Sequence, residues 1–261
     1  MGKKFELTEN YIVNDFGIKL FQIKCVSTFI YAKEGDLGGF IEKEENLSQS
    51  GNAWVYGNAK VYGNAKVFEN AKVYGNAEVY DNAKVFGDAK VYGDACVFGY
   101  AMIREKAWVF GKARVFGIAC ISDYAVVRGE ACVFDSANVS EFAAISENAS
   151  VHGGSKVYGR AFVYGNAHVY CHARVYGNAK VCGNADLKND NEHCGFDCFG
   201  FSNSHIHAYL TKEKQVEITF GSFCGSIEDF IEKEIDKCNK ENHEKQYKAI
   251  INVIRAKFGI E

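Results

Sequence analysis

The sequence predicts a mainly β protein, built as a triangular parallel β-solenoid with a separate module at each end. A six-residue period runs without insertion or deletion from Val55 to Asp186, and all 22 first positions of its hexads are Val or Ile. The fifth position of the same hexads is Ala 21 times and Ser once, at Ser155. The third position is Gly 14 times, which marks a turn in most hexads. A period this strict is the signature of a repeat architecture.

Alternation within each hexad predicts a short strand. Ala59 and Val61 lie two residues apart, so both side chains face inward, while Lys60 between them faces outward. The third and fourth positions supply the turn, because Gly, Asn and Asp tolerate left-handed backbone conformations. Three strands and three turns close one coil of 18 residues, so the 22 hexads predict about seven coils.

These hexads resemble those of the hexapeptide-repeat, left-handed parallel β-helix family, in which an aliphatic residue recurs with small residues. The resemblance implies a left-handed coil. The departure from the family motif is an aromatic ring after the aliphatic position, as at Tyr56, Tyr62 and Phe68. We expect these rings to lie outside and to stack from coil to coil.

Residues 1–46 are expected to form an N-terminal β cap and lead-in. The stretch 4–32 clusters β-forming residues on both sides of an Asn-Asp-Phe-Gly turn, which predicts two or three antiparallel strands. Such strands would cover the apolar side chains and unpaired edge of an open solenoid end. The segment 35–53 resembles the lead-in of a group of phage and bacterial hexapeptide-repeat proteins that are loosely called acyltransferases.

Residues 47–186 form the predicted solenoid, and residues 187–261 are expected to form a C-terminal α+β cap. Alternation over 205–211 and 215–220 predicts a β-hairpin. Ser226 followed by Asp229 has the spacing of a helix start, and an apolar face predicts a second helix from about Glu241 to Lys257. The segment 221–230 resembles the same phage group.

Composition limits the partners and the location. The net charge is −3 and is not polarised along the chain, so it indicates neither nucleic acid nor an acidic membrane as partner. No apolar run approaches the length of a membrane span, and the first ten residues lack a hydrophobic signal core. Ten cysteines without an export signal suggest reduced thiols. We therefore expect a cytoplasmic protein, in the host cytoplasm if the chain is phage-encoded.

One outward side of the repeats departs from the Lys and Asn consensus in four successive coils. Apolar, aromatic and Arg residues replace the consensus there, a composition typical of interfaces. The sequence leaves open a homo-oligomer (a dimer or trimer), a protein partner, or neutral drift. The candidate binding residues are Arg104, Lys106, Trp108, Tyr124, Val126, Arg128, Phe142, Arg160 and Phe162.

Three acidic residues, Glu105, Asp123 and Glu141, stack in a turn column beside these positions. Carboxylates one coil apart could bind a cation. Pairing with Arg104 and Lys106 is the alternative that we expect.

Signals for chemistry are few. The acyltransferase resemblance implies a histidine base, for which His152 and His172 are weak candidates, but no projecting loop interrupts the hexads. We expect no cofactor, with acyl-CoA required only if the protein is an acyltransferase. Zinc is a further alternative, but the spacing of Cys194, Cys198, His205 and His207 is uncommon for a zinc site, so no metal is expected.

The sequence thus favours a rigid, non-catalytic binding or scaffold protein that docks a macromolecular partner. The resemblance implies a phage-derived accessory protein, and inhibition of a host or defence protein is one action open to it. One alternative is an acyl-CoA-dependent acyltransferase with its active site at a subunit interface. The other is a structural polymer, which the predicted caps at both ends oppose.

Overall fold

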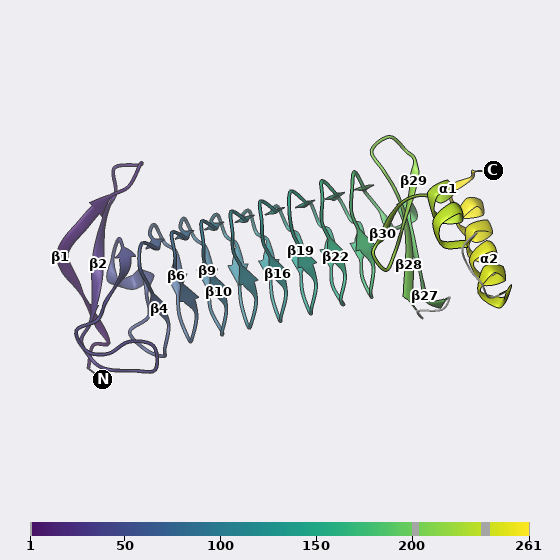
Figure 1. The fold of residues 1–261 in the computed structure, drawn as a ribbon. Helices are drawn as coiled ribbons and strands as arrows, with labels where there is room; N and C mark the ends of the chain where they lie inside the picture. The colour runs from purple at the N-terminus through teal and green to yellow at the C-terminus, as the bar shows by residue number, and fades with distance from the viewer. Residues whose placement is uncertain (1, 200–203, 236–240, 261) are drawn as a thin grey trace.

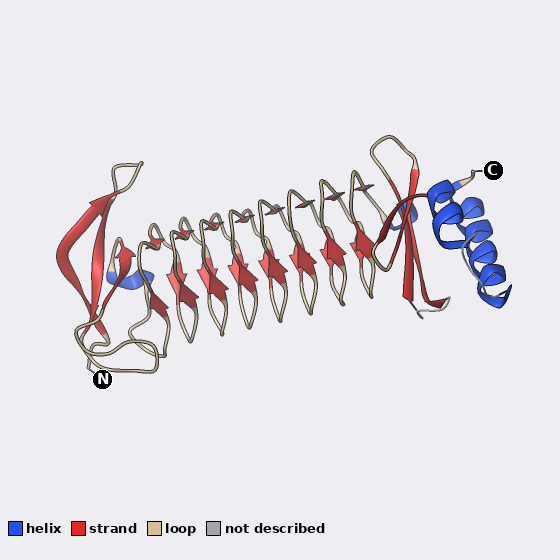
Figure 2. Ribbon diagram, in the orientation of Figure 1, coloured by secondary structure: helices blue, strands red, loops and turns tan. Residues whose placement is uncertain are grey.

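The computed structural model describes residues 2–199, 204–235 and 241–260 and has the predicted fold, a left-handed parallel β-solenoid with a module at each end (Figures 1 and 2). The chain enters through three longer strands, β1 (Phe5–Val13), β2 (Lys19–Cys25) and β3 (Leu37–Ile41), and a 3-10 turn, η1 (Glu44–Asn46). A run of two-residue strands follows, at the predicted spacing of six residues.

These short strands are β4 (Trp54–Val55), β5 (Lys60–Val61), β6 (Lys66–Val67), β7 (Lys72–Val73), β8 (Glu78–Val79), β9 (Lys84–Val85), β10 (Lys90–Val91), β11 (Cys96–Val97), β12 (Met102–Ile103), β13 (Trp108–Val109), β14 (Arg114–Val115), β15 (Cys120–Ile121), β16 (Val126–Val127), β17 (Cys132–Val133), β18 (Asn138–Val139), β19 (Ala144–Ile145), β20 (Ser150–Val151), β21 (Lys156–Val157), β22 (Phe162–Val163), β23 (His168–Val169), β24 (Arg174–Val175), β25 (Lys180–Val181) and β26 (Asp186–Leu187).

Each short strand pairs in parallel with the strand 18 residues away, so the three sides of the triangle belong to sheets of eleven, eight and seven strands, the first of which also contains β1, β2 and β3. The solenoid makes about eight turns rather than the predicted seven. The difference arises because the ladder extends beyond the hexads at both ends. Ile41 pairs with Val61, Leu47 bridges to Val67, and Leu187 continues the inward column after the last hexad.

The interior is filled by the two columns that the sequence marks as inward. Every Val or Ile at a first position is fully buried, and the Ala column is buried throughout. The exception in the Ala column, Ser155, keeps its hydroxyl satisfied because Oγ donates to the carbonyl of His152 at 2.8 Å. Burial of one Val is worth about 1.5 kcal/mol or more, so this repeated column is the main source of stability.

The third position of every hexad has a positive φ, including the hexads without Gly there. Where the residue is Asp or Glu, its carboxylate accepts a hydrogen bond from the third-position amide one coil further on, as Glu69 does from Gly87 at 2.8 Å. The acids in this arrangement are Glu69, Asp81, Glu105, Asp123, Asp135, Glu141 and Glu147.

The column of Glu105, Asp123 and Glu141 therefore caps backbone amides. Arg104 pairs with Glu105 at 2.6 Å, as expected, but the expected pairing of Lys106 with an acid is wrong. The ammonium of Lys106 instead donates to the hydroxyl of Tyr124 at 3.0 Å. Within the described ranges, no three His, Cys, Asp or Glu side chains are grouped so that they could hold a metal ion.

The second-position rings stack along the corners of the triangle, as predicted. Tyr80 and Phe98, for example, have centroids 4.9 Å apart and planes within 1° of parallel. One corner carries an aromatic ring in every coil, namely Tyr62, Tyr80, Phe98, Phe116, Phe134, His152 and Tyr170. The ladders at the other two corners are interrupted.

The N-terminal strands cover the first coil, as predicted. β1 pairs antiparallel with β2, β2 with β3, and β3 joins the eleven-stranded sheet. Phe5 and Phe29 meet the ring of Trp54 edge-on and leave it 1% exposed. The ammonium of Lys4 donates to the carbonyl of Ala53 at 2.8 Å, which satisfies a backbone acceptor of the first coil.

The C-terminal module begins after a 3-10 turn, η2 (Asp190–Glu192), with a four-stranded antiparallel sheet of β27 (His193–Phe199), β28 (Ser204–Leu210), β29 (Val216–Phe220) and β30 (Phe223–Ser226). It ends with α1 (Ile227–Phe230), a π-helical turn, η3 (Ile231–Ile235), and α2 (Glu241–Phe258). The predicted hairpin and second helix are confirmed. So is the Ser226 cap, whose Oγ accepts from the amide of Asp229 at 3.0 Å. No helix in the described ranges is long and apolar enough to cross a membrane.

The two faces of this C-terminal sheet have different partners. Tyr209 on one face is buried in the core that runs through the solenoid. Ile206, Ala208 and Ile218 belong to a second core, which includes Phe230 and Ile254 of the helices. The sheet therefore lies between the last coil and the helices, as Figure 1 shows.

Candidate functional site

The eight-stranded side of the solenoid carries most of the predicted binding residues. In its strand order β10–β13–β16–β19–β22, Trp108 lies directly between Lys90 and Val126. The alternation of each strand sends Val109 and its equivalents into the core, so the residues before them face outward. The inward Val or Ile column continues unchanged through the coils in which the outward residues depart from the Lys consensus.

A shallow groove of about 360 Å³ lies at Trp108 and is lined by Asp88, Lys90, Lys106, Trp108, Tyr124 and Val126. Trp108 is 40% exposed and Tyr124 is 49% exposed. The Lys90 ammonium lies 4.5 Å from the Trp108 ring centroid, and that of Lys106 lies 5.0 Å from the Tyr124 ring centroid. Each ring is thus accessible and has a Lys ammonium over it, and the ring attracts that ammonium electrostatically.

The aromatic surface continues for another coil. Phe142 stacks on Tyr124 with centroids 5.0 Å apart and is 59% exposed, and the Arg160 guanidinium lies 6.0 Å from the Phe142 ring centroid. We call the set Lys106, Trp108, Tyr124, Val126 and Phe142 the Trp108 surface. The ring ladders at the two corners beside it are interrupted in these same coils, where Ser122, Ser140 and Ser146 replace second-position rings.

Not every predicted residue faces this surface. The guanidinium of Arg104 turns to Glu105 and to Cys120, which belongs to the seven-stranded sheet. Phe162 faces outward on β22 of the same sheet as Trp108 but stacks on Tyr164, with centroids 4.5 Å apart. Arg128 lies exposed at the adjoining corner. Sequence reasoning missed Asp88 and Lys90, because both match the repeat consensus and only the groove distinguishes them.

The weak catalytic candidates occupy ordinary repeat positions. His152 is sandwiched in the unbroken corner ladder, with its ring 4.5 Å from Phe134 and 5.3 Å from Tyr170. Burial lowers the pKa of His152. His172 is an exposed turn residue. The stacking gives His152 a structural role, and no hydrogen bond to an acid orients it as a base, since Asp135 is 3.8 Å from its Nδ1.

The three described zinc candidates, Cys194, His205 and His207, line the same cavity but are not grouped so that they could hold a metal ion. Cys194 pairs with Ala208 across the strands and joins the core beneath the helices, where burial raises its thiol pKa to about 11. His205 and His207 lie on the opposite face of the sheet, toward the last coil. The side chain of Cys198 lies outside the described residues.

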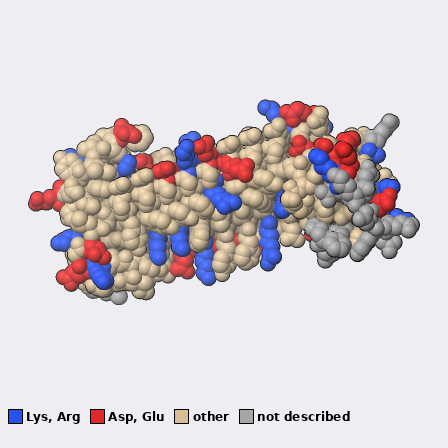
Figure 3. Space-filling model, in the orientation of Figure 1, with Lys and Arg blue, Asp and Glu red and all other residues tan. Residues whose placement is uncertain are grey.

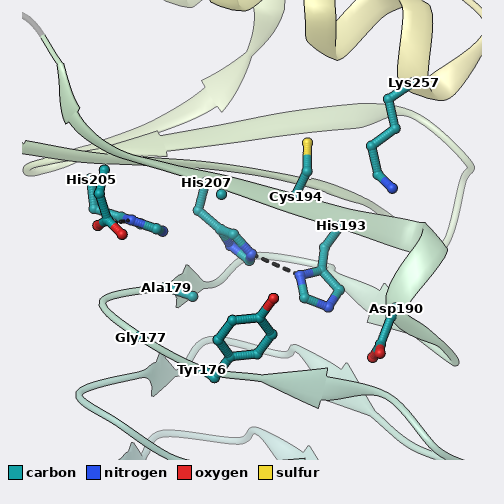
Figure 4. A pocket seen from close by; sticks show the side chains of 11 residues that line it. Tyr176, Gly177, Ala179, Asp190, His193, Cys194, His205, His207 and Lys257 are labelled. Carbon is teal, nitrogen blue, oxygen red and sulfur yellow. Dashed lines mark hydrogen bonds and ion pairs between the residues drawn. The ribbon is translucent and has the colours of Figure 1, made fainter.

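A second cavity, of about 400 Å³, lies between the last coil and the C-terminal sheet (Figure 4). His193 enters it from β27 and His207 from β28, and their Nδ1 and Nε2 atoms are 3.0 Å apart. Burial lowers the pKa of His193 and, more strongly, that of His207, to about 3. The sequence places His193 beside the zinc candidate Cys194 and His207 in a His-x-His pattern, but it does not indicate that the two imidazoles meet.

The same junction brings two cysteine side chains into contact, although their Cα atoms are 7.4 Å apart, beyond the usual span of a disulfide. Cys182 of the last hexad faces Cys224 of β30. The hydroxyl of Tyr209 lies 3.0 Å from the Cys182 sulfur. The cap and the solenoid thus meet at two cysteines that are 42 residues apart in the sequence.

Charges of both signs occur along the visible face of the rod, and neither sign dominates it (Figure 3). This distribution fits the small net charge of −3. Any preference of the Trp108 surface for a partner therefore arises from its local groups rather than from the field of the whole molecule.

No protein-family model matches this chain, and no curated protein matches it either.

Proposed function

We propose that the protein is a non-catalytic binding protein, a rigid rod that presents the Trp108 surface to a protein partner. One observation carries the proposal. Exposed rings replace the Lys and Asn consensus on one side of the solenoid, in coils whose inward Val and Ala columns continue unchanged. The fold therefore does not require the rings, and a groove lies among them.

The composition of this surface supports a protein partner. Tyr and Trp with adjoining cations are the residues that contribute most binding energy in protein interfaces. Lys90 and Lys106 already lie over the rings, so a partner with a carboxylate could accept from these ammonium groups while an apolar side chain covers Trp108. Such a partner would be acidic at the edges of its contact and apolar in the middle.

The resemblance of segments 35–53 and 221–230 to phage and bacterial hexapeptide-repeat proteins suggests the setting of this function, a phage-derived accessory protein in the host cytoplasm. Inhibition of a host or defence protein by docking is consistent with that setting. The proposal involves no cofactor. The competing explanation is self-association, in which a second copy of this chain covers the same surface in a dimer or trimer.

A pair of variants tests the proposal. Trp108→Lys with Tyr124→Asn restores the repeat consensus at both positions, so the fold should survive, while capture of a partner from host lysate should weaken by about thirtyfold. The matched control is Met102→Lys with Tyr100→Asn, which makes the same consensus changes at exposed residues of other sides. It should leave capture unchanged.

Light scattering on the same proteins separates the two occupants. A foreign partner predicts equal masses for wild type and both variants, whereas self-association predicts a lower mass for the Trp108 variant alone. If the Trp108 variant keeps both its mass and its captured partners, the surface has no binding function and the proposal is wrong.

A further inference from the structure

The cavity between the last coil and the C-terminal sheet is enclosed mainly by polar and titratable side chains. Its polar lining consists of Tyr176, Asp190, His193, Asp197, His205, His207 and Lys257. His193 is 7% exposed and His207 is 1% exposed (Figure 4). Its volume of about 400 Å³ is in the range of sites for small molecules.

A chain of hydrogen bonds fixes the protons of the two buried imidazoles. Nδ1 of His207 lies 3.0 Å from the carbonyl oxygen of Lys180, which can only accept, so Nδ1 carries the proton. His207 is buried and has no carboxylate partner in the part of the chain that the structure describes, so it is neutral and its Nε2 presents a lone pair. Nδ1 of His193, 3.0 Å away, must therefore donate to it.

The far nitrogen of His193 is then a bare acceptor. Its Nε2 is buried and has no hydrogen-bond partner among the described residues. Burial lowers the pKa of His193, so the neutral ring, with a lone pair on Nε2, is favoured. Nε2 of His205 is also buried and unpartnered, while its Nδ1 contacts Asp197 at 2.7 Å. Buried polar atoms of this kind are uncommon and are often completed by a ligand.

The charges around the cavity select the sign of that ligand. Asp190 is already engaged by Arg174, whose amide and Nε approach its two oxygens at 2.8 and 2.6 Å. Lys257 of α2 lines the cavity and lies near His193, and no described carboxylate lies within ion-pair distance of its ammonium. A cation placed at His193 would therefore meet an unneutralised ammonium, whereas an anionic group would be attracted to it.

We propose that this cavity is a binding site for a small anionic molecule that carries a hydroxyl or N–H donor beside its charge. The donor bonds to Nε2 of His193, and the carboxylate or phosphate pairs with Lys257. Gly195 keeps the site open, because a Cβ at that position would lie 2.7 Å from the His205 ring. This site is independent of the Trp108 surface.

Matched probes test the chemistry on the full-length protein. Lactate is compared with propionate, and glycerol 3-phosphate with propyl phosphate, by saturation-transfer NMR and by the shifts of the His193 ring protons. At least one hydroxylated probe should bind about tenfold more tightly than its deoxy partner, because only the former donates to the imidazole. The stronger pair identifies whether carboxylate or phosphate is preferred.

Two variants and a control locate the site. Lys257→Gln and His193→Phe should each weaken the binding by about tenfold, and Lys212→Gln, in the hairpin turn outside this cavity, should not. If His193→Phe fails to fold, Lys257→Gln still decides the outcome. The proposal is overturned if no probe binds at millimolar concentration, if hydroxylated and deoxy probes bind equally, or if Zn²⁺ alone shifts the His193 ring protons.

Discussion

At the scale of single residues, the third position of the hexad shows how an unfavourable conformation is tolerated. A positive φ is ordinary for Gly but costs an L residue about 1 kcal/mol. Asp81, with a φ of 57°, compensates because its carboxylate accepts from the amide of Gly99 at 3.1 Å. The acids at this position therefore complete backbone hydrogen bonding, and they need no ligand to explain them.

Asp81 allows this account to be tested. Asp81→Ala keeps the positive φ and loses the amide acceptor, so it should destabilise the protein by about 1–2 kcal/mol. Asp81→Gly loses the same hydrogen bond but removes the strain, so its stability should lie within about 0.5 kcal/mol of wild type. Urea denaturation of the two variants provides the comparison. Equal losses in both would show that φ does not matter at this position.

The buried imidazole of His207 makes the C-terminal junction sensitive to acid. Its folded pKa is about 3, below the usual histidine value of 6.5, because burial disfavours the charged ring. Between these two pKa values the unfolded state thus binds more protons than the folded state. The free energy of unfolding therefore decreases as the pH is lowered through that window. The contribution of His207 is fully present above about pH 6.5 and is lost as the pH falls toward 3.

Hydrogen–deuterium exchange can follow this loss. After correction for the intrinsic rate, amides of β27 to β29 should exchange faster at pH 4.5 than at pH 7, while those of the central coils should not, since their core contains no titratable side chain. His207→Phe should flatten this pH dependence, whereas the exposed His168→Gln should retain it. Equal acid sensitivity of the His207 variant and wild type would contradict this role of His207.

At the scale of elements, the sequence was sufficient for the solenoid because one physical requirement recurs in every hexad. Each strand must send a Val or Ile and an Ala into a narrow interior, so the register of Val55 determines that of Val181. The N-terminal strands and the hairpin around 211–214 follow from alternation and turn residues in the same way.

β27 was not predicted, because its two faces pack against different environments. His193 and Gly195 face the polar cavity, while Cys194 and Phe196 pack beneath the helices. The strand therefore lacks an apolar alternation that could be recognised. β30 (Phe223–Ser226) was not predicted, because it is short and directly precedes the predicted helix start at Ser226.

The candidate sites were predictable only in part, because they depend on which residues become neighbours in the folded chain. The Trp108 surface is visible in the sequence because its rings break a strict consensus. Lys90 is not visible, because a consensus Lys becomes special only when Trp108 lies beside it. The cavity at His193 depends on how the C-terminal sheet packs against the last coil, and no periodicity encodes that contact.

Both ends of the solenoid use side-chain donors to satisfy backbone carbonyls that no further coil can pair. Lys4 donates to Ala53 at the first coil, and burial lowers its pKa to about 8. At the last coil, the carbonyl of Lys180 accepts from Thr219 Oγ1 at 2.8 Å and from the His207 ring at 3.0 Å. An uncapped coil would leave such acceptors and its apolar interior open.

At the scale of the whole molecule, one apolar core extends from Phe5 in the N-terminal module through the coils to Tyr209 in the C-terminal sheet. The helices have a second core with the outer face of that sheet. The rod and its N-terminal module therefore share one core. One face of the C-terminal sheet packs into that same core, and its other face forms a second core with the helices, as expected for a cap that closes the rod.

Truncation after Lys188 tests the role of the cap while keeping the last inward residue, Leu187. Loss of the module would expose Val181 and Leu187, now fully buried, and remove both donors to the Lys180 carbonyl. Because the exposed end is a strand edge above an apolar interior, truncated rods should associate end to end. Light scattering should show a mass that rises with concentration, against a constant mass for the full-length chain.

The Trp108→Lys and Tyr124→Asn changes, introduced into the truncated chain, separate this end association from lateral contacts. The rise in mass should persist, since these residues lie on a side of the rod and not at its end. A truncated chain that stays monodisperse and melts with the full-length protein would show that the last coil needs no cover. The buried contacts of Tyr209 and the donors to Lys180 would then contribute nothing to keeping the rods separate.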